Sequence, residues 1–226
     1  TVALGVHPLI ARILLNRGIA DPEGARKFLN PSLDDLLDPS ALPDLEKAVP
    51  RILRAIHVEE PITVYGDYDA DGVTSTAIIV RTLQELGARP WEFTYYIPKR
   101  LEEGYGLSRG AVEKLHRAGT RVLITVDCGV TAVEEVALAR QLGMEVIVLD
   151  HHEPPSVLPK AYALVNPKLA EGRDRLPPYC AAGLAFQLSR ALRRAAGVGG
   201  DPYDLVDLAA VGTIADVVPL TGDNRV

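Results

Sequence analysis

Cysteine is scarce in this chain of 226 residues, where Cys128 and Cys180 are the only two. Two cysteines are too few for a disulfide framework or a thiolate zinc cage, so we expect a reducing, cytoplasmic setting. No apolar run approaches the roughly 18 residues that a membrane-spanning helix needs. The first 20 residues lack the layout of a signal peptide. The chain starts at Thr1 rather than Met and stops abruptly at Val226, so we expect a fragment of a longer protein.

Basic residues are absent from one stretch that is rich in acid. No Lys or Arg occurs from Pro61 to Val80, yet Asp67, Asp69 and Asp71 fall within five residues there. Carboxylates this close repel one another unless a cation lies nearby. A bound metal ion is the simplest explanation of this cluster. The net charge of −6 argues against a dedicated nucleic-acid-binding surface. It does not exclude a nucleic-acid enzyme, because two divalent ions would offset about four of those charges.

The acidic stretch also lacks what an EF-hand calcium loop requires. Such a loop needs a bidentate Glu at its twelfth position, and counting from Asp67 that position is Ile78. The segment before the loop, Pro61 to Tyr65, predicts a strand, whereas an EF-hand needs an entering helix. A strand, an acidic turn and then a helix is typical of α/β enzymes that bind ligands at strand ends.

The periodicity of apolar residues predicts an α/β protein. The first 60 residues predict a helical N-terminal segment, and residues 61–226 predict a domain in which strands alternate with helices. Continuous apolar runs in several strands indicate burial on both faces, which means a parallel sheet with helices on both sides. The predicted strands are 61–65, 91–96, 121–126, 144–149 and 162–165. The predicted helices are 8–16, 21–29, 45–56, 73–86, 108–118, 132–142, 182–196 and 203–211.

Acidic and imidazole groups follow three of these strands. The first strand leads to the aspartates at 67, 69 and 71, the third to Asp127, and the fourth to Asp150, His151 and His152. Asp216 lies in an apolar stretch just after a helix. Any one of these aspartates alone could simply cap a helix or make a structural pair. Their convergence on one edge of a sheet favours a metal site.

The type of ligand indicates the metal. Carboxylates with imidazole, and no pair of thiolates, suit Mn²⁺ or Mg²⁺ better than structural zinc. The candidate ligands are more than one ion needs from the protein. Two ions would activate a water and stabilise the leaving oxygen of a phosphoryl displacement.

With these residues assembled, the chain resembles the DHH phosphoesterase superfamily and, within it, the RecJ family of single-stranded-DNA exonucleases. The resemblance covers nearly the whole chain. The segments that carry it are 64–76 (VYGDYDADGVTST), 103–108 (EGYGLS), 125–129 (TVDCG), 149–152 (LDHH) and 211–220 (VGTIADVVPL). It implies a 5′-to-3′ exonuclease that degrades single-stranded DNA to mononucleotides in recombination and repair. A helicase and a single-strand-binding protein are possible partners of such an enzyme.

The resemblance also implies roles for individual residues. Asp127 would be a catalytic residue that bridges two metal ions, His152 would contact the scissile phosphate, and Asp150 would orient a histidine. Full members of the family carry a second, substrate-binding domain, so we expect residues 61–226 to be the metal-binding catalytic domain and the second domain to lie outside this chain. The positions that match the family's metal ligands are Asp69, Asp71, Asp127, His151 and Asp216, with Asp67 as an additional acid. Side chains that could hold phosphate or stack a base are Lys99, Arg100, Tyr105 and Arg109.

Two alternatives remain open. The same metal site could hydrolyse pyrophosphate, cyclic dinucleotides or short oligonucleotides. Those branches of the superfamily place a His four residues before the Asp-x-Asp pair, where this chain has Tyr65. The chain could instead be a non-catalytic binding module of the same fold. Such relatives have lost metal-site residues, whereas this chain keeps them all.

Overall fold

The structure is a computed structural model that describes residues 4–170, 176–200 and 202–226, with the side chains of Arg100 and Glu102 outside the described part. Its centre is a sheet of five strands, all parallel, in the order β2-β1-β3-β4-β5. The strands are β1 (Ile62–Gly66), β2 (Phe93–Tyr96), β3 (Val122–Val126), β4 (Glu145–Leu149) and β5 (Ala163–Val165).

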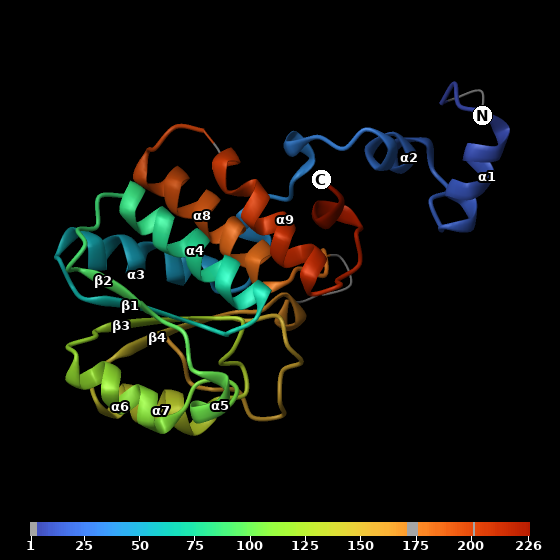
Figure 1. Cartoon of the computed structure of the whole chain (residues 1–226). Coiled ribbons are helices and arrows are strands. Elements are labelled where there is room, and N and C mark those ends of the chain that lie inside the picture. Colours follow the sequence, from blue (N-terminus) through green and yellow to red (C-terminus); the bar gives the residue numbers. More distant parts are fainter. Residues whose placement is uncertain (1–3, 171–175, 201) are drawn as a thin grey trace.

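Helices cover both faces of this sheet (Figure 1). One face packs against α3 (Leu45–His57), α4 (Ala70–Glu85), α8 (Ala181–Ala196) and α9 (Val206–Ala215). The other packs against α5 (Arg100–Glu103), α6 (Arg109–Arg117) and α7 (Val133–Gln141). The predicted parallel α/β fold is therefore confirmed.

The alternation of side chains along β3 explains the two layers. Val122, Ile124 and Val126 point into the core beneath α3, α4 and α8, whereas Leu123 points into the core beneath α6 and α7. Every residue of β3 is buried. A strand with apolar residues on both faces requires a covering layer on each side, which this arrangement provides.

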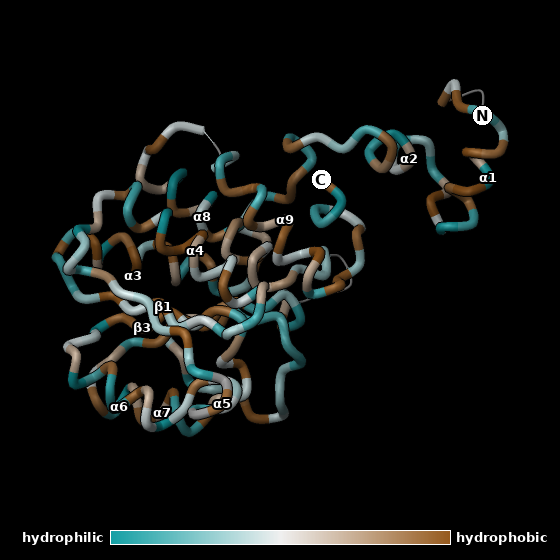
Figure 2. Tube along the Cα trace, viewed as in Figure 1, coloured by the Kyte–Doolittle hydropathy of each residue, from teal (hydrophilic) through white to brown (hydrophobic). Residues whose placement is uncertain are grey.

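The N-terminal helices differ in how they pack. Figure 1 shows α1 (Pro8–Asn16) and α2 (Pro22–Leu29) extending away from the sheet. Figure 2 shows hydrophobic residues on α1, where Leu9 is 62% exposed. Helix α3, by contrast, buries Leu45, Ala48 and Ile52 in the core above the sheet. The division of the chain at residue 60 stays a prediction.

The last helix begins later than predicted. A short 3₁₀ turn (Tyr203–Leu205) precedes α9, which runs from Val206 to Ala215 rather than over 203–211. Asp216 is its C-terminal cap residue. None of the helices described is both long and apolar enough to cross a membrane.

Candidate metal centre

The first acidic motif lies between β1 and α4. Asp67 follows β1 directly and is buried. Asp69 is the N-cap of α4, and its Oδ1 accepts a hydrogen bond of 2.9 Å from the Gly72 N–H. A Cβ on Gly72 would lie 2.5 Å from the carbonyl oxygen of Asp67, so glycine is needed at that position. The turn thus holds two carboxylates close together at the end of the strand.

Asp71 is held by the N-terminus of α8. Its Oδ2 accepts a hydrogen bond of 2.7 Å from the Ala181 N–H, and its Oδ1 accepts one of 2.8 Å from the Ala182 N–H. A helix N-terminus favours a nearby negative charge, and these two N–H groups give each oxygen of the Asp71 carboxyl a hydrogen-bond donor. Gly212 of α9 packs so closely that a Cβ there would lie 2.7 Å from Oδ1 of Asp71. The position of Asp71 therefore depends on α8 and α9.

Asp127 follows β3 in a left-handed backbone conformation, with φ of 63°. This conformation is uncommon outside glycine, although Asp tolerates it better than most residues. Its N–H donates to the Leu149 carbonyl oxygen at 3.0 Å, which joins the ends of β3 and β4. Burial raises the pKa of the Asp127 carboxyl to about 9, with a further contribution from the negative charges of Asp71 and Asp69. Without a cation, this site favours a protonated carboxyl.

Asp150 follows β4 and has its donors in place. Its Oδ2 accepts from the Val130 N–H at 2.8 Å, and its Oδ1 lies 2.7 Å from Nδ1 of His152. Burial opposes its charge, yet hydrogen bonds from His152 and Val130 outweigh that effect and lower the pKa of Asp150. The same pairing raises the pKa of His152. Asp150 therefore fixes the orientation of His152.

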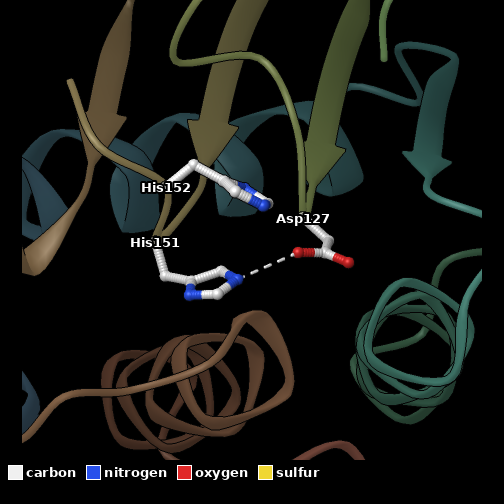
Figure 3. A group of neighbouring side chains, drawn as sticks. All are labelled: Asp127, His151 and His152. Carbon is white, nitrogen blue, oxygen red and sulfur yellow. Dashed lines mark ion pairs between the residues drawn. The ribbon is translucent and has the colours of Figure 1, made fainter. Parts of the chain in front are cut away.

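His151 lies at the centre of the cluster. Its Nε2 is 3.2 Å from Oδ1 of Asp127, and Figure 3 shows the two side chains pointing toward each other. The same nitrogen lies 3.8 Å from Oδ2 of Asp71 and 3.8 Å from Oδ2 of Asp216. Nε2 is shielded from solvent and makes no hydrogen bond of acceptable geometry to any residue that the structure describes. An imidazole nitrogen facing three carboxylates is the arrangement expected of a metal ligand.

Three overlapping groups of side chains could each hold an ion. In each group, one ligand atom from every residue lies within 4.8 Å of the others. Asp127 and His151 each belong to two of the groups, so neighbouring ions would share ligands. Oxygen and imidazole donors without a thiolate suit Mn²⁺ or Mg²⁺. The groups are Asp67–Asp69–Asp127, Asp71–His151–Asp216 and Asp127–His151–His152.

The structure thus brings together every residue predicted as a metal ligand, and it adds His152 to the cluster. Their roles in binding metal stay predictions. Asp216 contributes from the end of α9, and burial raises the pKa of its carboxyl although His151 opposes this. Asp150 contacts Nδ1 of His152, which agrees with the expectation that Asp150 orients a histidine.

The predicted substrate residues are placed differently from one another. The hydroxyl of Tyr105 lies 3.4 Å from the Asp127 carbonyl oxygen and from both ring nitrogens of His152. Tyr105 therefore lies at the acidic cluster itself. Lys99 and Arg109 are exposed at the starts of α5 and α6, and the side chain of Arg100 is outside the described part. The substrate roles of all four stay predictions.

Sequence reasoning missed Asn166. It follows β5 directly, and its buried Nδ2 donates to the His152 carbonyl oxygen at 2.9 Å. Its Oδ1 accepts from the Lys168 N–H at 2.9 Å. The signal was the same as for the aspartates, a polar residue at the end of a strand, but β5 has only three residues. The donors from α8 to Asp71 had no signal in the sequence.

A parallel α/β sheet that gathers carboxylates and imidazoles at its carboxyl edge defines the class as an α/β protein with a candidate metal centre. A comparison with known families sharpens this result, because the profile described as "DHH family, N-terminal domain" matches residues 61–213. The chain belongs to the DHH family.

Named relatives agree with the resemblance seen in the sequence. The chain is 43% identical to the single-stranded-DNA-specific exonuclease RecJ of Bacillus subtilis over 225 residues, which is 100% of this chain and 28% of that protein. It is similar to the crystal structure of RecJ with Mn²⁺ from Thermus thermophilus, with a TM-score of 0.82, 37% identity and coverage of 99% of this chain and 31% of that one. A crystal structure of exonuclease RecJ bound to manganese aligns with a TM-score of 0.75 and 43% identity over 81% of this chain and 46% of that one. The chain spans 28–39% of the length of the first curated relatives that it matches.

Proposed function

We propose that this chain is the metal-binding catalytic part of an exonuclease that hydrolyses single-stranded DNA from its 5′ end to mononucleotides. The observation that carries the proposal is the shielded His151 Nε2, which faces three carboxylates on three different elements. Relatives named single-stranded-DNA-specific exonuclease support the same conclusion, and so do similar solved structures of RecJ with manganese.

Two of the three sets of side chains would each hold one ion. Asp67, Asp69 and Asp127 would hold one Mn²⁺ or Mg²⁺, and Asp71, His151 and Asp216 would hold the other. Asp127 belongs to the first set and its Oδ1 lies 3.2 Å from Nε2 of His151 in the second, so Asp127 would help to hold both ions. When bound, such ions lower the pKa of water and offset charge on a phosphoryl group. The protein keeps the ligands in place through the α8 N-terminus, the Asp69 cap and the strand ends.

His152 is suited to contact the scissile phosphate. Asp150 accepts a hydrogen bond from Nδ1, which raises the pKa of the ring and so favours the protonated imidazolium. In the imidazolium both nitrogens donate, Nδ1 to Asp150 and Nε2 to a phosphate oxygen. The ring lies 4.5 Å, centroid to centroid, from that of His151, so a phosphate bound at the metals would be within its reach.

Other parts of the proposal follow from the family. Lys99, Arg100 and Arg109 would hold phosphates, and Tyr105 would stack a base. Action in recombination and repair would involve a helicase and a single-strand-binding protein. A cytoplasmic location is supported by Cys128 and Cys180, which are both buried and unpaired.

A digestion assay tests the proposal directly. The full gene product with Mn²⁺ would be given an oligonucleotide labelled at either end, the matching duplex, pyrophosphate and a cyclic dinucleotide. We expect labelled mononucleotide from the 5′ end of the single strand and little attack on the duplex. Asp204→Ala, which changes an exposed acid paired with Arg81 on the surface, is the control variant and should keep full activity.

The other outcomes distinguish the alternatives. Hydrolysis of pyrophosphate or the cyclic dinucleotide alone would keep the metal centre but overturn the exonuclease function. No hydrolysis of any substrate, together with binding of the single strand, would favour a binding module of this fold.

A further inference from the structure

Tyr65 is buried near the end of β1, on the side of the sheet that α6 and α7 cover. It is the fourth residue of β1, two positions before Asp67, and its side chain is fully buried. Its ring stacks on that of Tyr96 in β2, with centroids 5.5 Å apart and planes 12° from parallel. Its hydroxyl donates a hydrogen bond of 2.8 Å to the Gly106 carbonyl oxygen. A buried tyrosine hydroxyl needs such a partner, and here the partner belongs to a loop.

That loop carries Tyr105 between two glycines in left-handed conformations. Gly104 has φ of 78° and Gly106 has φ of 79°. Glycine has no side chain that could hold such a turn in place, so the position of the turn depends on hydrogen bonds made by the turn's backbone. The Tyr65 hydroxyl supplies one of these on the C-terminal side of Tyr105.

The N-terminal side of the turn is fixed from β2. Glu103 accepts a hydrogen bond from the Tyr96 hydroxyl, and its other oxygen accepts one of 3.1 Å from the Lys99 N–H. Because Tyr96 also stacks on Tyr65, the two aromatic rings hold both sides of the turn against the sheet.

This turn places Tyr105 beside His152 and Asp127 of the acidic cluster. The hydroxyl of Tyr105 is 3.4 Å from the Asp127 carbonyl oxygen and 3.4 Å from the ring nitrogens of His152. The two rings meet edge to face, with centroids 6.0 Å apart. Tyr105 is nevertheless 55% exposed, so little packing holds it there apart from these contacts.

We propose that Tyr65 is a positioning residue for hydrolysis: its hydroxyl fixes the turn at 104–106 and thereby holds Tyr105 against His152 and Asp127. Tyr65 makes no contact with substrate and acts only through Tyr105. The part of this inference that concerns hydrolysis rests on the proposed function, whereas the part that concerns the turn does not.

A double-mutant cycle in the full gene product tests the catalytic part. Tyr65→Phe keeps the ring and removes only the hydrogen bond to Gly106. We expect kcat on single-stranded DNA to fall about 3- to 10-fold in Tyr65→Phe, with KM within about two-fold, as loss of one hydrogen bond allows. Tyr105→Phe should cost at least as much. The double variant should be no slower than Tyr105→Phe alone, because both changes act through one contact.

Hydrogen exchange tests the structural part without any assay of activity. The amides of residues 104–107 should exchange at least about five-fold faster in Tyr65→Phe than in the unchanged protein. Tyr179→Phe is the matched control, since it also loses a buried hydroxyl but belongs to the core on the opposite face of the sheet. It should leave exchange at 104–107 unchanged.

Each contrary result has a definite meaning. Unchanged exchange at 104–107 in Tyr65→Phe would overturn the inference even if the protein is an active exonuclease. Multiplied losses in the double variant would show that Tyr65 does not act through Tyr105 and would also overturn it. If the unchanged protein fails to hydrolyse single-stranded DNA, the proposed function fails, and faster exchange would still establish that Tyr65 fixes the turn.

Discussion

The ends of β3 and β4 each present a buried aspartate, yet the two carboxyls behave in opposite ways. Asp127 after β3 has its pKa raised to about 9 by burial and by nearby acids. Asp150 after β4 has its pKa lowered, because donors from Val130 and His152 outweigh its burial. The residue type, the position after a strand and the degree of burial are alike. The two carboxyls differ in their hydrogen-bond donors. The protein supplies N–H donors to Asp150, whereas the charge of Asp127 is disfavoured unless a cation lies nearby.

This difference assigns roles to the two residues. A carboxylate whose donors are all provided can orient a neighbour, and Asp150 orients His152. A carboxylate that burial and like charges disfavour gains most from a divalent ion. Asp127 is therefore the residue on which metal binding should depend most strongly. Substitutions at the two positions should separate these roles.

The largest effect is expected at Asp127. Asp127→Ala removes the proposed ligand that would be shared by the two ions, so hydrolysis should fall at least about 1,000-fold at every Mn²⁺ concentration. The thermal midpoint of the metal-free protein should change little, because removal of a disfavoured buried acid offsets the strain of an Ala at a positive φ. Activity across a Mn²⁺ titration and thermal unfolding in a chelator are the measurements. Near-normal activity in this variant would remove Asp127 from the metal centre.

Asp150→Asn should cost less and in a different way. The amide keeps an oxygen for the Val130 N–H but cannot stabilise a charged His152, so we expect about a 10- to 100-fold loss in kcat. The Mn²⁺ concentration for half-maximal activity should change much less than kcat, because the carboxylates at the metals are untouched. Measuring kcat against Mn²⁺ for both variants checks this. Equal losses at the two positions, or a large shift in the Mn²⁺ requirement here, would contradict the division of roles.

Much of this site was predictable because the relevant signals are local. A buried strand followed by an acid predicts where that acid lies, and Asp127 and Asp150 are both at the expected edge. Their different environments were not predictable. The left-handed φ of Asp127 and the Val130 N–H that reaches Asp150 depend on how the loop after β3 folds back.

Contacts distant in sequence explain the other omissions. The donors to Asp71 come from α8, more than 100 residues away, and those α8 residues are alanines whose side chains suggest nothing. The late start of α9 has a similar cause. Apolar residues lie on every side of the 206–215 helix and acids lie only near its start, at Asp204 and Asp207, so periodicity gives no clear boundary. A 3₁₀ turn forms the first residues of the predicted helix.

The stability of the metal-free protein should depend on pH in opposite directions at the two aspartates. The Asp127 pKa lies above its ordinary value of 3.8, so the stability linked to its proton is present below about pH 4 and is lost as the pH rises toward about 9. The Asp150 pKa lies below 3.8, so its stabilising effect is present above that value and is lost in stronger acid.

Thermal unfolding in a chelator at pH 5.5 and pH 8 tests this pair of signs. Asp127→Asn should raise the thermal midpoint at pH 8 by about 2–5 °C and change it less at pH 5.5. Asp150→Asn should lower the midpoint at both pH values. Added Mn²⁺ should raise the midpoint of the unchanged protein more at pH 8, where fewer ligands hold protons. A lower midpoint at pH 8 for Asp127→Asn would show that its carboxylate is already stabilised without metal.

The smallest effect is expected at Asn166, which follows β5 and supports the segment after β4. Asn166 donates to the His152 carbonyl oxygen and so fixes the backbone of the residue that Asp150 orients. Asn166→Ala removes the donor to that partly buried oxygen, and we expect about a 2- to 5-fold loss in kcat with a cost of about 1–3 kcal/mol in the free energy of unfolding.

Asn224→Ala is the matched control, since the partly buried Asn224 also donates to backbone carbonyl oxygens, those of Pro178 and Pro219, but not to that of His152. It should keep kcat within about two-fold. Combining Asn166→Ala with Asp150→Asn then asks whether both act through His152, in which case the double variant loses less than the product of the single losses. If the losses multiply fully, Asn166 contributes only to the stability of the fold, and Asp150 orients His152 without help from Asn166.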